Sequence, residues 1–253
     1  MGTRIMGHRM KTSVGGDITD VLPILIGGLP QIATVTIQEI RVPPSLQSRV
    51  PPLPELAPLV DIALRLRETY DFPFWDALLL TAERRRKGIA EEILDGASFH
   101  QSMTSAVHTQ EVPAASLTPT AVARYARKIS NGNITVISSR VRLNNGSEAH
   151  LPLLDFSLPP SPANDATVGR IVTRLGQRGY LLDSGNSYHF YGNALLSDSG
   201  YRRFLGAALL FSPLVDHRWV AHQLIEGASA LRVSGGKNGS KLPRLVAEIQ
   251  YSE

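Results

Sequence analysis

The sequence of 253 residues contains no cysteine. This absence excludes a disulfide framework, a thiolate metal site and a cysteine nucleophile, and it fits a reducing, cytoplasmic compartment. Long apolar runs are also missing, since a run such as Ala207–Phe211 is far too short to cross a membrane. The basic start of the chain lacks the apolar segment of a signal peptide. We therefore expect a cytoplasmic protein that depends on a packed core.

Positive charge is in slight excess and is carried mainly by arginine. The chain has 26 basic and 22 acidic residues, for a formal net charge of +4, and 21 of the basic residues are arginine. Because the guanidinium group makes planar, bidentate contacts with phosphates, this surplus permits a nucleotide or nucleic-acid ligand. A genomic bias toward arginine codons explains the composition equally well, so the charge alone does not require such a ligand.

The first part of the chain predicts an accessory, mainly helical module over residues 1–115. Residues 33–42 alternate β-branched and polar side chains, which is typical of a strand. The proline-rich stretch 42–58 predicts an extended connector, and the Ser-, Thr- and Pro-rich segment 98–120 predicts a loop and a domain boundary. Between them, apolar residues at helical spacing predict helices over 58–70, 73–87 and 89–94.

Residues 116–253 predict a second domain of the α+β class, in which helices cover a mostly antiparallel sheet. Alternating or apolar patterns predict strands over 134–143, 150–156, 180–191 (a hairpin), 230–233 and 244–250. Periodic apolar residues predict helices over 120–129, 164–176, 198–211 and 216–226, with Asn164 and Asp165 as the candidate cap of the second.

Three polar residues interrupt apolar segments of this second domain. Asp155 lies in an apolar strand, where an ionised carboxylate is costly unless it is paired or binds a metal. His189 follows a tight glycine turn, and strand periodicity places it on one face with Ser187 and Tyr191. Asp216 directly precedes an amphipathic helix.

Each of these residues also has a purely structural interpretation. Asp155 would cap a turn at the end of its strand, and His189 would be a half-buried histidine bonded to the backbone. Asp216 would be an ordinary helix N-cap. Taken one at a time, the three positions leave these alternatives open.

In order and together, these positions resemble the motif series of the archaeo-eukaryotic primase superfamily, whose members are called primase-polymerases. Leu-Leu-Asp155-Phe resembles the first motif, and Ser184-Gly-Asn-Ser-Tyr-His189 resembles the second. Leu-Val-Asp216 is similar to the third. The segment that begins Leu-Arg232-Val and continues into a Gly/Ser/Lys loop containing Lys237 is similar to a fourth. The resemblance covers about residues 120–253.

The resemblance implies a primase-like, RRM-like fold and a nucleotidyl transfer that depends on Mg²⁺ or Mn²⁺. It implies that Asp155 and Asp216 are catalytic metal ligands. The residues that it implies for binding the nucleotide and its phosphates are Ser187, His189, Arg232 and, more weakly, Lys237. A nucleoside triphosphate and DNA or RNA are the implied partners. In the alternative of a non-catalytic interaction module, the N-terminal half would recruit a protein partner.

The sequence departs from the family pattern at one position, because the second aspartate of the first motif is replaced by Ser157. Serine carries no charge, so a pair of cations would be held weakly, or only one would bind. Asp165 and Asp183 lack the family spacing. Two functions therefore stay open: a metal-dependent nucleotidyltransferase, and a catalytically inactive interaction or nucleic-acid-binding module on the same scaffold.

Overall fold

The computed structural model of the chain divides into two compact units, of which one comprises residues 43–101 and the other 1–42 with 102–253. The residues that the structure describes are 8–12, 15–42, 49–70, 72–85, 88–100, 106–127, 132–235 and 241–251. Each unit has its own hydrophobic core, and each is described by itself below.

The smaller unit is helical, as the apolar periodicity predicts. Its helices are α2 (Ala57–Tyr70), α3 (Phe74–Arg84) and α4 (Glu91–Ser98). The rings of Phe74 and Trp75 meet edge to face at 5.2 Å, and both side chains are buried. Gly96 of α4 lies so close to the Trp75 ring that an added Cβ would be 2.6 Å from it. The aromatic residues at the start of α3 therefore form the core of this unit.

The larger unit contains two antiparallel sheets, of which sheet A contains most of the predicted motifs. Its strands are β1 (His8–Thr12), β6 (Leu153–Asp155), β7 (Gly179–Asp183), β8 (Tyr188–Gly192) and β10 (Arg244–Tyr251). They lie in the order β1-β10-β7-β8-β6, and every neighbouring pair is antiparallel. The hairpin predicted over residues 180–191 is the β7–β8 pair.

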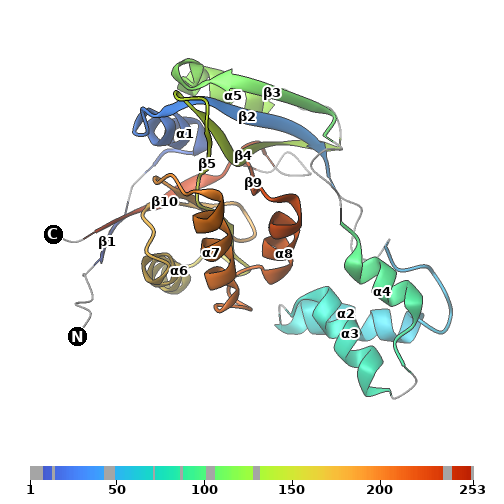
Figure 1. Cartoon of the computed structure of the whole chain (residues 1–253). Helices are drawn as coiled ribbons and strands as arrows, with labels where there is room; N and C mark the ends of the chain where they lie inside the picture. Colours follow the sequence, from blue (N-terminus) through green and yellow to red (C-terminus); the bar gives the residue numbers. More distant parts are fainter. Residues whose placement is uncertain are drawn as a thin grey trace. The chain divides into compact units, whose positions relative to one another are not determined.

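Helices α6 (Pro162–Arg174), α7 (Asp198–Leu209) and α8 (His217–Glu226) cover one face of sheet A (Figure 1). Alternation along β8 sends Tyr188 and Phe190 into the core shared with these helices, while Tyr191 belongs to the core on the opposite face. The cap of α6 is Ser161, whose Oγ accepts from Asn164 N at 3.2 Å. The sequence prediction of Asn164 or Asp165 as the cap was therefore wrong, because the helix already begins at a proline.

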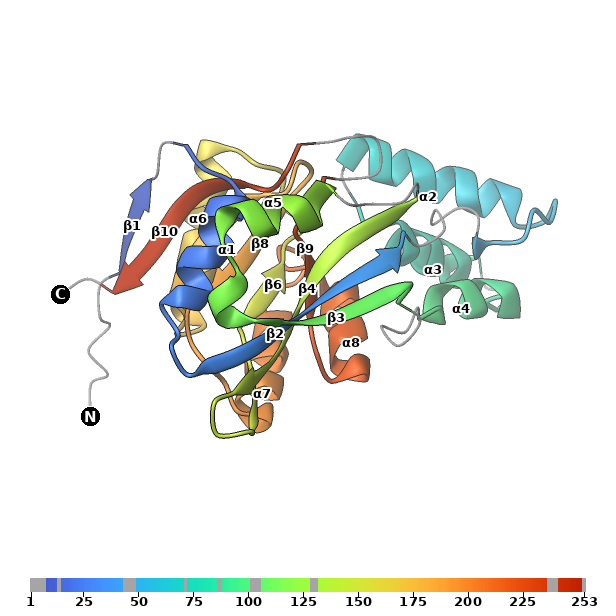
Figure 2. The same cartoon turned by 90° about the horizontal axis from the view of Figure 1, so that it is seen from above.

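Sheet B comprises β2 (Ile32–Arg41), β3 (His108–Pro113), β4 (Asn133–Leu143) and β5 (Glu148–His150), in the order β3-β2-β4-β5, with β9 (Ala230–Arg232) also paired to β4 (Figure 2). Helices α1 (Ile18–Gly27) and α5 (Pro119–Arg127) pack on one face of it. Leu22 and Leu25 of α1 join Val35 and Ile137 in a core that continues to Tyr191 of sheet A. The two sheets therefore share a core.

The sequence-based division at residue 115 differs from this arrangement. β2 and β3 lie before that boundary, yet both belong to the sheet that contains β4. The segment expected to be a loop over 98–120 contains β3 and the first residues of α5.

The expected class is confirmed: the fold is α+β, with antiparallel sheets covered by helices, and it is consistent with a primase-like protein. None of the helices in the described ranges combines the length and the apolar character that a membrane crossing requires.

Candidate functional site

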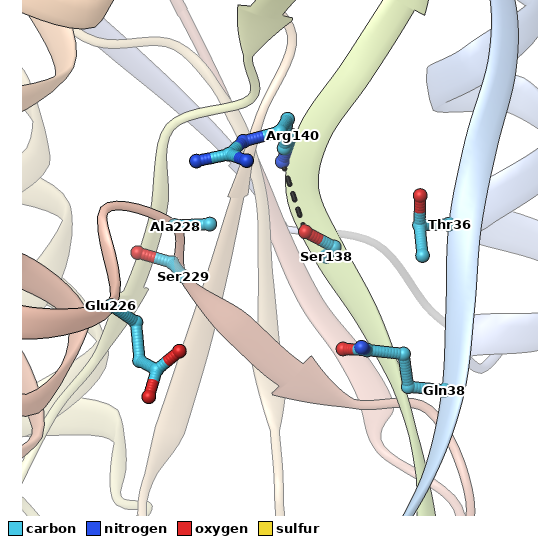
Figure 3. Close-up of a pocket in the computed structure, with 7 residues that line it drawn as sticks. All are labelled: Thr36, Gln38, Ser138, Arg140, Glu226, Ala228 and Ser229. Atoms are coloured by element: carbon cyan, nitrogen blue, oxygen red, sulfur yellow. Dashed lines mark hydrogen bonds between the residues drawn. The ribbon is translucent and has the colours of Figure 1, made fainter. Parts of the chain in front are cut away.

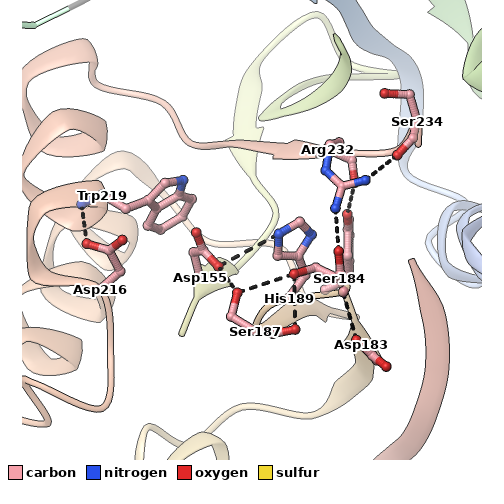
Figure 4. A network of polar contacts seen from close by, with 11 residues as sticks. Asp155, Asp183, Ser184, Ser187, His189, Asp216, Trp219, Arg232 and Ser234 are labelled. Carbon is pink, nitrogen blue, oxygen red and sulfur yellow. Dashed lines mark hydrogen bonds and ion pairs between the residues drawn. The ribbon is translucent and has the colours of Figure 1, made fainter. Parts of the chain in front are cut away.

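Asp155 and His189 face each other on neighbouring strands of sheet A. The β6–β8 register pairs the two residues directly, and Asp155 Oδ1 lies 3.7 Å from His189 Nε2 (Figure 4). Ser187, just before β8, donates from Oγ to the same carboxylate oxygen at 3.4 Å. The His189 and Tyr191 rings lie 6.3 Å apart. The predicted shared face of Ser187, His189 and Tyr191 is therefore present.

Asp216 reaches the same place through a short strand-like pairing. Phe156 forms an antiparallel bridge with Val215, and Asp216 N donates to Asp155 O at 3.2 Å. This register sets Asp155 and Asp216 directly opposite each other, and such residues have Cβ atoms about 5 Å apart. Two acids that are far apart in the sequence thus meet at the end of β6.

Asp216 is also the N-cap of a helix, which was its alternative interpretation from the sequence. Its Oδ1 accepts from Trp219 N at 2.9 Å and caps α8. The cap fixes one carboxylate oxygen against the N-terminus of the helix. Figure 4 shows the Trp219 indole in the neighbourhood of the Asp216 and Asp155 side chains. Sequence reasoning missed Trp219, although the third residue after an N-cap is the one whose N–H returns to the cap.

The environment of Asp155 disfavours its charged form. Burial is the main cause and the neighbouring charge of Asp216 the second, and together they raise the pKa of Asp155 to about 8, against the smaller opposing effect of the Ser187 hydrogen bond. The side chain nevertheless keeps 22% of its exposure, so solvent or a ligand reaches it. A cation beside Asp155 would favour its ionised form.

His189 is more deeply buried than Asp155, with 8% of its side chain exposed. Burial, followed by the positive charge of Arg232, lowers its pKa to about 3, so the imidazole is neutral at physiological pH. Its Nδ1 is buried and has no hydrogen-bond partner among the residues that the structure describes. A buried polar atom without a partner destabilises a protein, and this one marks a place where a ligand would complete the bonding.

Arg232 approaches the site from β9 of sheet B. Its Nη1 donates to Ser234 O and its Nη2 to Ser184 O, both at 2.5 Å, while the Tyr191 hydroxyl donates to Arg232 O at 2.8 Å. The guanidinium group therefore joins β9 to the turn between β7 and β8 and places a positive charge near His189. Lys237, the weaker phosphate-binding candidate, lies outside the described residues.

The replacement at Ser157 leaves two carboxylates at the site. Ser157 is exposed and its N–H donates to Leu214 O at 2.9 Å, so it continues the pairing that brings Asp216 close. The two other acids considered from the sequence are used elsewhere. Asp165 contacts the Tyr188 hydroxyl, and Asp183 accepts from a main-chain N–H of its own turn at 2.7 Å.

Within the described ranges, no group of three or more Asp, Glu or His side chains is placed to hold a metal. The carboxylates that could contribute to a cation site here are those of Asp155 and Asp216. Mg²⁺ is commonly bound through one or two carboxylates together with waters and substrate phosphates. The residues present fit one such cation and fall short of the set that a pair would need.

The fold and this site define a primase-like protein: antiparallel sheets that share a core, with a strand aspartate, a hairpin histidine and a second aspartate brought together. A family model described as archaeo-eukaryotic primase 1D-like matches residues 113–243. The chain belongs to this family of primase-like proteins. Neither the curated proteins nor the solved structures yielded a match.

Proposed function

We propose that the chain binds a nucleoside triphosphate with a single divalent cation, Mg²⁺ or Mn²⁺, at the site formed by Asp155, Asp216 and His189, next to a bound DNA or RNA strand. The observation that carries the proposal is the convergence of the two aspartates, which stand opposite each other beside an imidazole whose Nδ1 has no hydrogen-bond partner in the described part of the chain. Family membership supports an interaction with nucleotides or nucleic acid in general.

In this proposal Asp155 and Asp216 hold the cation, which would neutralise charge on the triphosphate. His189 is neutral, so it has one N–H to give, and donation from Nδ1 to a phosphate oxygen would satisfy the buried nitrogen. Ser187 supports Asp155 through its hydroxyl. Arg232 supplies a nearby positive charge, and Lys237 is the candidate for a further phosphate contact.

We propose nucleotide binding rather than nucleotidyl transfer as the main function, because the site has too few carboxylates for two cations. Transfer by this class of chemistry uses two cations that stabilise the attacking and the leaving oxygen. With Ser157 in place of the third carboxylate, the site fits one cation, and we expect transfer to be weak relative to binding. The second candidate function, a catalytically inactive interaction module, is favoured by the same replacement and by the use of the Asp216 carboxylate as a helix cap.

A binding and extension experiment separates these functions. The purified protein is given Mn²⁺, a labelled nucleoside triphosphate and a single-stranded template, beside an Asp155→Asn plus Asp216→Asn variant. Asp198→Asn is the matched control, because Asp198 is an exposed acid whose ion pair with Arg202 lies on the surface of α7.

We expect cation-dependent nucleotide binding by the wild type and the control and its loss in the double variant. Equal binding by all three proteins, or none by the wild type, would refute the proposal. Extension of the template by the wild type and the control, and not by the double variant, would establish the transferase. Nucleic-acid binding that weakens steeply with salt would indicate phosphate contacts, and a flat salt dependence would count against a nucleic-acid partner.

A further inference from the structure

A hollow of about 250 Å³, lined mostly by polar residues, lies on sheet B. It is formed by β2, β4 and the connection between α8 and β9 (Figure 3). The side chains that line it are Thr36, Gln38, Ser138, Arg140, Glu226, Ala228 and Ser229. None of them belongs to the site of Asp155, Asp216 and His189.

The hollow exists because β4 bulges where it passes β2. The register shifts between Val35 and Ile37, so β4 has extra residues at this point. Arg140 N donates to Ser138 Oγ at 3.1 Å across the bulge. Arg140 Nη2 also donates to Gly227 O at 3.3 Å, which holds the guanidinium group against the end of α8.

A buried polar network fixes the floor of the hollow. Ser229 N donates to Ser139 Oγ at 2.8 Å, and Ser229 Oγ shares a hydrogen bond of 2.8 Å with the Tyr201 hydroxyl. Ser139 Oγ in turn lies 3.2 Å from His150 Nδ1, and the His150 and Tyr201 rings stack at 4.3 Å. Networks of this kind hold their members in one arrangement. The hollow is therefore a rigid, pre-formed feature.

The charges around the hollow indicate what it would accept. Arg140 Nε lies 3.6 Å from Glu148 Oε2, and Glu226 contributes a second carboxylate to the lining. A free phosphate in the hollow would meet the Glu226 carboxylate, and the guanidinium group of Arg140 is already paired with Glu148. Figure 3 shows the Glu226 carboxylate and the Gln38 amide turned toward each other across the opening. A neutral ligand that both donates and accepts hydrogen bonds suits this lining better than an anion.

We propose that this hollow binds a nucleobase, and guanine in preference to the other bases. Guanine presents the O6 and N7 acceptors that arginine commonly contacts, and its amino group supplies donors for a carboxylate. Arg140 and Glu226 are the two side chains that provide these complementary contacts. The hydroxyl of Ser138 and the amide of Gln38 offer further polar contacts along the rim.

The position of the hollow deepens the proposed function, on which this part of the argument rests. Ser229 lies at its floor, directly before β9, and Arg232 ends that strand three residues further along the chain, about 10 Å away for extended backbone. Ala230 and Arg232 share one face of β9 by alternation, and they pair with Ser138 and Val136 of β4. One nucleic-acid strand along this face would place a phosphate near Arg232 and a neighbouring base in the hollow.

The test uses guanosine monophosphate, titrated into the full chain with EDTA present so that the cation-dependent site stays empty. Chemical shifts of the backbone amides report where it binds, and ribose 5-phosphate and the other three monophosphates serve as controls. Glu226→Gln and Arg140→Lys are compared with the wild type. The lysine variant keeps the charge but loses the planar fork of arginine, and Asp155→Asn leaves the hollow untouched.

We expect shifts around Ser138 and Ser229, with binding about tenfold weaker in each hollow variant and unchanged in Asp155→Asn. Equal effects of ribose 5-phosphate, a preference for another base, or no shift at these residues would overturn the inference. Cation-dependent triphosphate binding measured on the same samples tests the proposed function separately. If guanosine monophosphate does not bind at the hollow but cation-dependent triphosphate binding is present, this inference fails and the proposed function stands. The opposite result refutes the proposed function alone.

Discussion

Asp155 Oδ1 lies 3.7 Å from His189 Nε2, across a pair of neighbouring antiparallel strands. The register of β6 and β8 imposes this meeting, and the bridge between Phe156 and Val215 brings Asp216 to the other side of Asp155. Three polar side chains are thus gathered at the edge of the apolar cores, with Ser187 and Arg232 close to them. Because they lie together, the residues of the three short motifs can act as one site.

A Ser157→Asp substitution would restore the missing carboxylate of the first motif. Residues 155 and 157 share a face if the extended pairing continues, and the hydrogen bond from Ser157 N to Leu214 O extends it that far. Since Ser157 is exposed, we expect a folded protein that binds Mn²⁺ more tightly, by about tenfold for one added ligand charge.

Isothermal titration with Mn²⁺ and a nucleoside triphosphate measures the effect of this substitution. Ser157→Asn is the control, because asparagine has nearly the same shape as aspartate but carries no charge. Equal affinities for Mn²⁺ in the Asp and Asn variants would mean that position 157 does not face the cation.

Tyr188→Phe is expected to lower stability and to spare the site. The Tyr188 hydroxyl accepts from Ser161 N at 2.7 Å and contacts the Asp165 carboxylate, so its loss leaves polar groups without a partner at the start of α6. We expect the free energy of unfolding to fall by about 1–3 kcal/mol in urea titrations. Tyr70→Phe, at a residue that is 72% exposed, should change it by less than about 0.5 kcal/mol.

Cation-dependent nucleotide binding by folded Tyr188→Phe should match the wild type, because Tyr188 lies on the face of β8 opposite His189. A loss of nucleotide binding that exceeds the loss of stability would place Tyr188 in the site.

Gly179→Ala should be one of the most damaging single changes in sheet A. Gly179 has φ +146°, and an added Cβ would lie 2.2 Å from Tyr191 O, in the strand that contains His189. We expect a loss of more than about 2 kcal/mol in the free energy of unfolding, since neither backbone can move without disturbing the β7–β8 pair.

The matched control for this change is Gly206→Ala. Gly206 lies in helix α7 with open space around the added Cβ, so alanine there should raise stability by about 0.5–1 kcal/mol. If both variants unfold at the same urea concentration, the backbone at Gly179 accommodates a Cβ and the prediction is wrong.

The buried His150 makes stability depend on pH. Burial is the main cause that lowers its pKa, so the folded protein keeps the imidazole neutral while the unfolded chain protonates near pH 6.5. The free energy of unfolding is therefore unaffected by His150 above pH 6.5. Below that pH it falls, by at most about 1.4 kcal/mol per pH unit. The charged groups that act on His150 are, from the largest effect to the smallest, Arg140, Asp198, Glu148 and Arg202.

Urea denaturation of the wild type and His150→Gln at pH 5 and pH 7.5 checks this pH dependence. We expect the stability difference between the two proteins to shrink at pH 5. A difference that grows at pH 5 would mean that the folded state holds the protonated imidazole.

Local pattern was sufficient to predict most elements of the larger unit. The alternation over residues 134–143 became β4 (133–143), and the hairpin over 180–191 became β7 and β8. The convergence of Asp155, His189 and Asp216 was an expectation that came from the resemblance of the motif series to the primase superfamily. Their roles as ligands for a cation and a triphosphate stay predictions.

The sequence did not predict which strands pair when they lie far apart in the chain. β3 is largely exposed, with Val112 as its buried residue, so its composition resembles that of a loop. Its strand identity comes from hydrogen bonds to β2, and β2 and β4 form one sheet although the helical unit separates them in the chain. The hollow beside Arg140 was likewise hidden, because it arises from a bulge that pairing alone creates.

The most direct test of the central claim is to locate Mn²⁺ in crystals grown with a non-hydrolysable nucleoside triphosphate, by anomalous scattering at the manganese edge. The account predicts one strong peak within coordination distance of both Asp155 and Asp216, with the triphosphate reaching toward His189 Nδ1. A nucleotide bound elsewhere in the chain, or manganese absent from this pair of carboxylates, would contradict it.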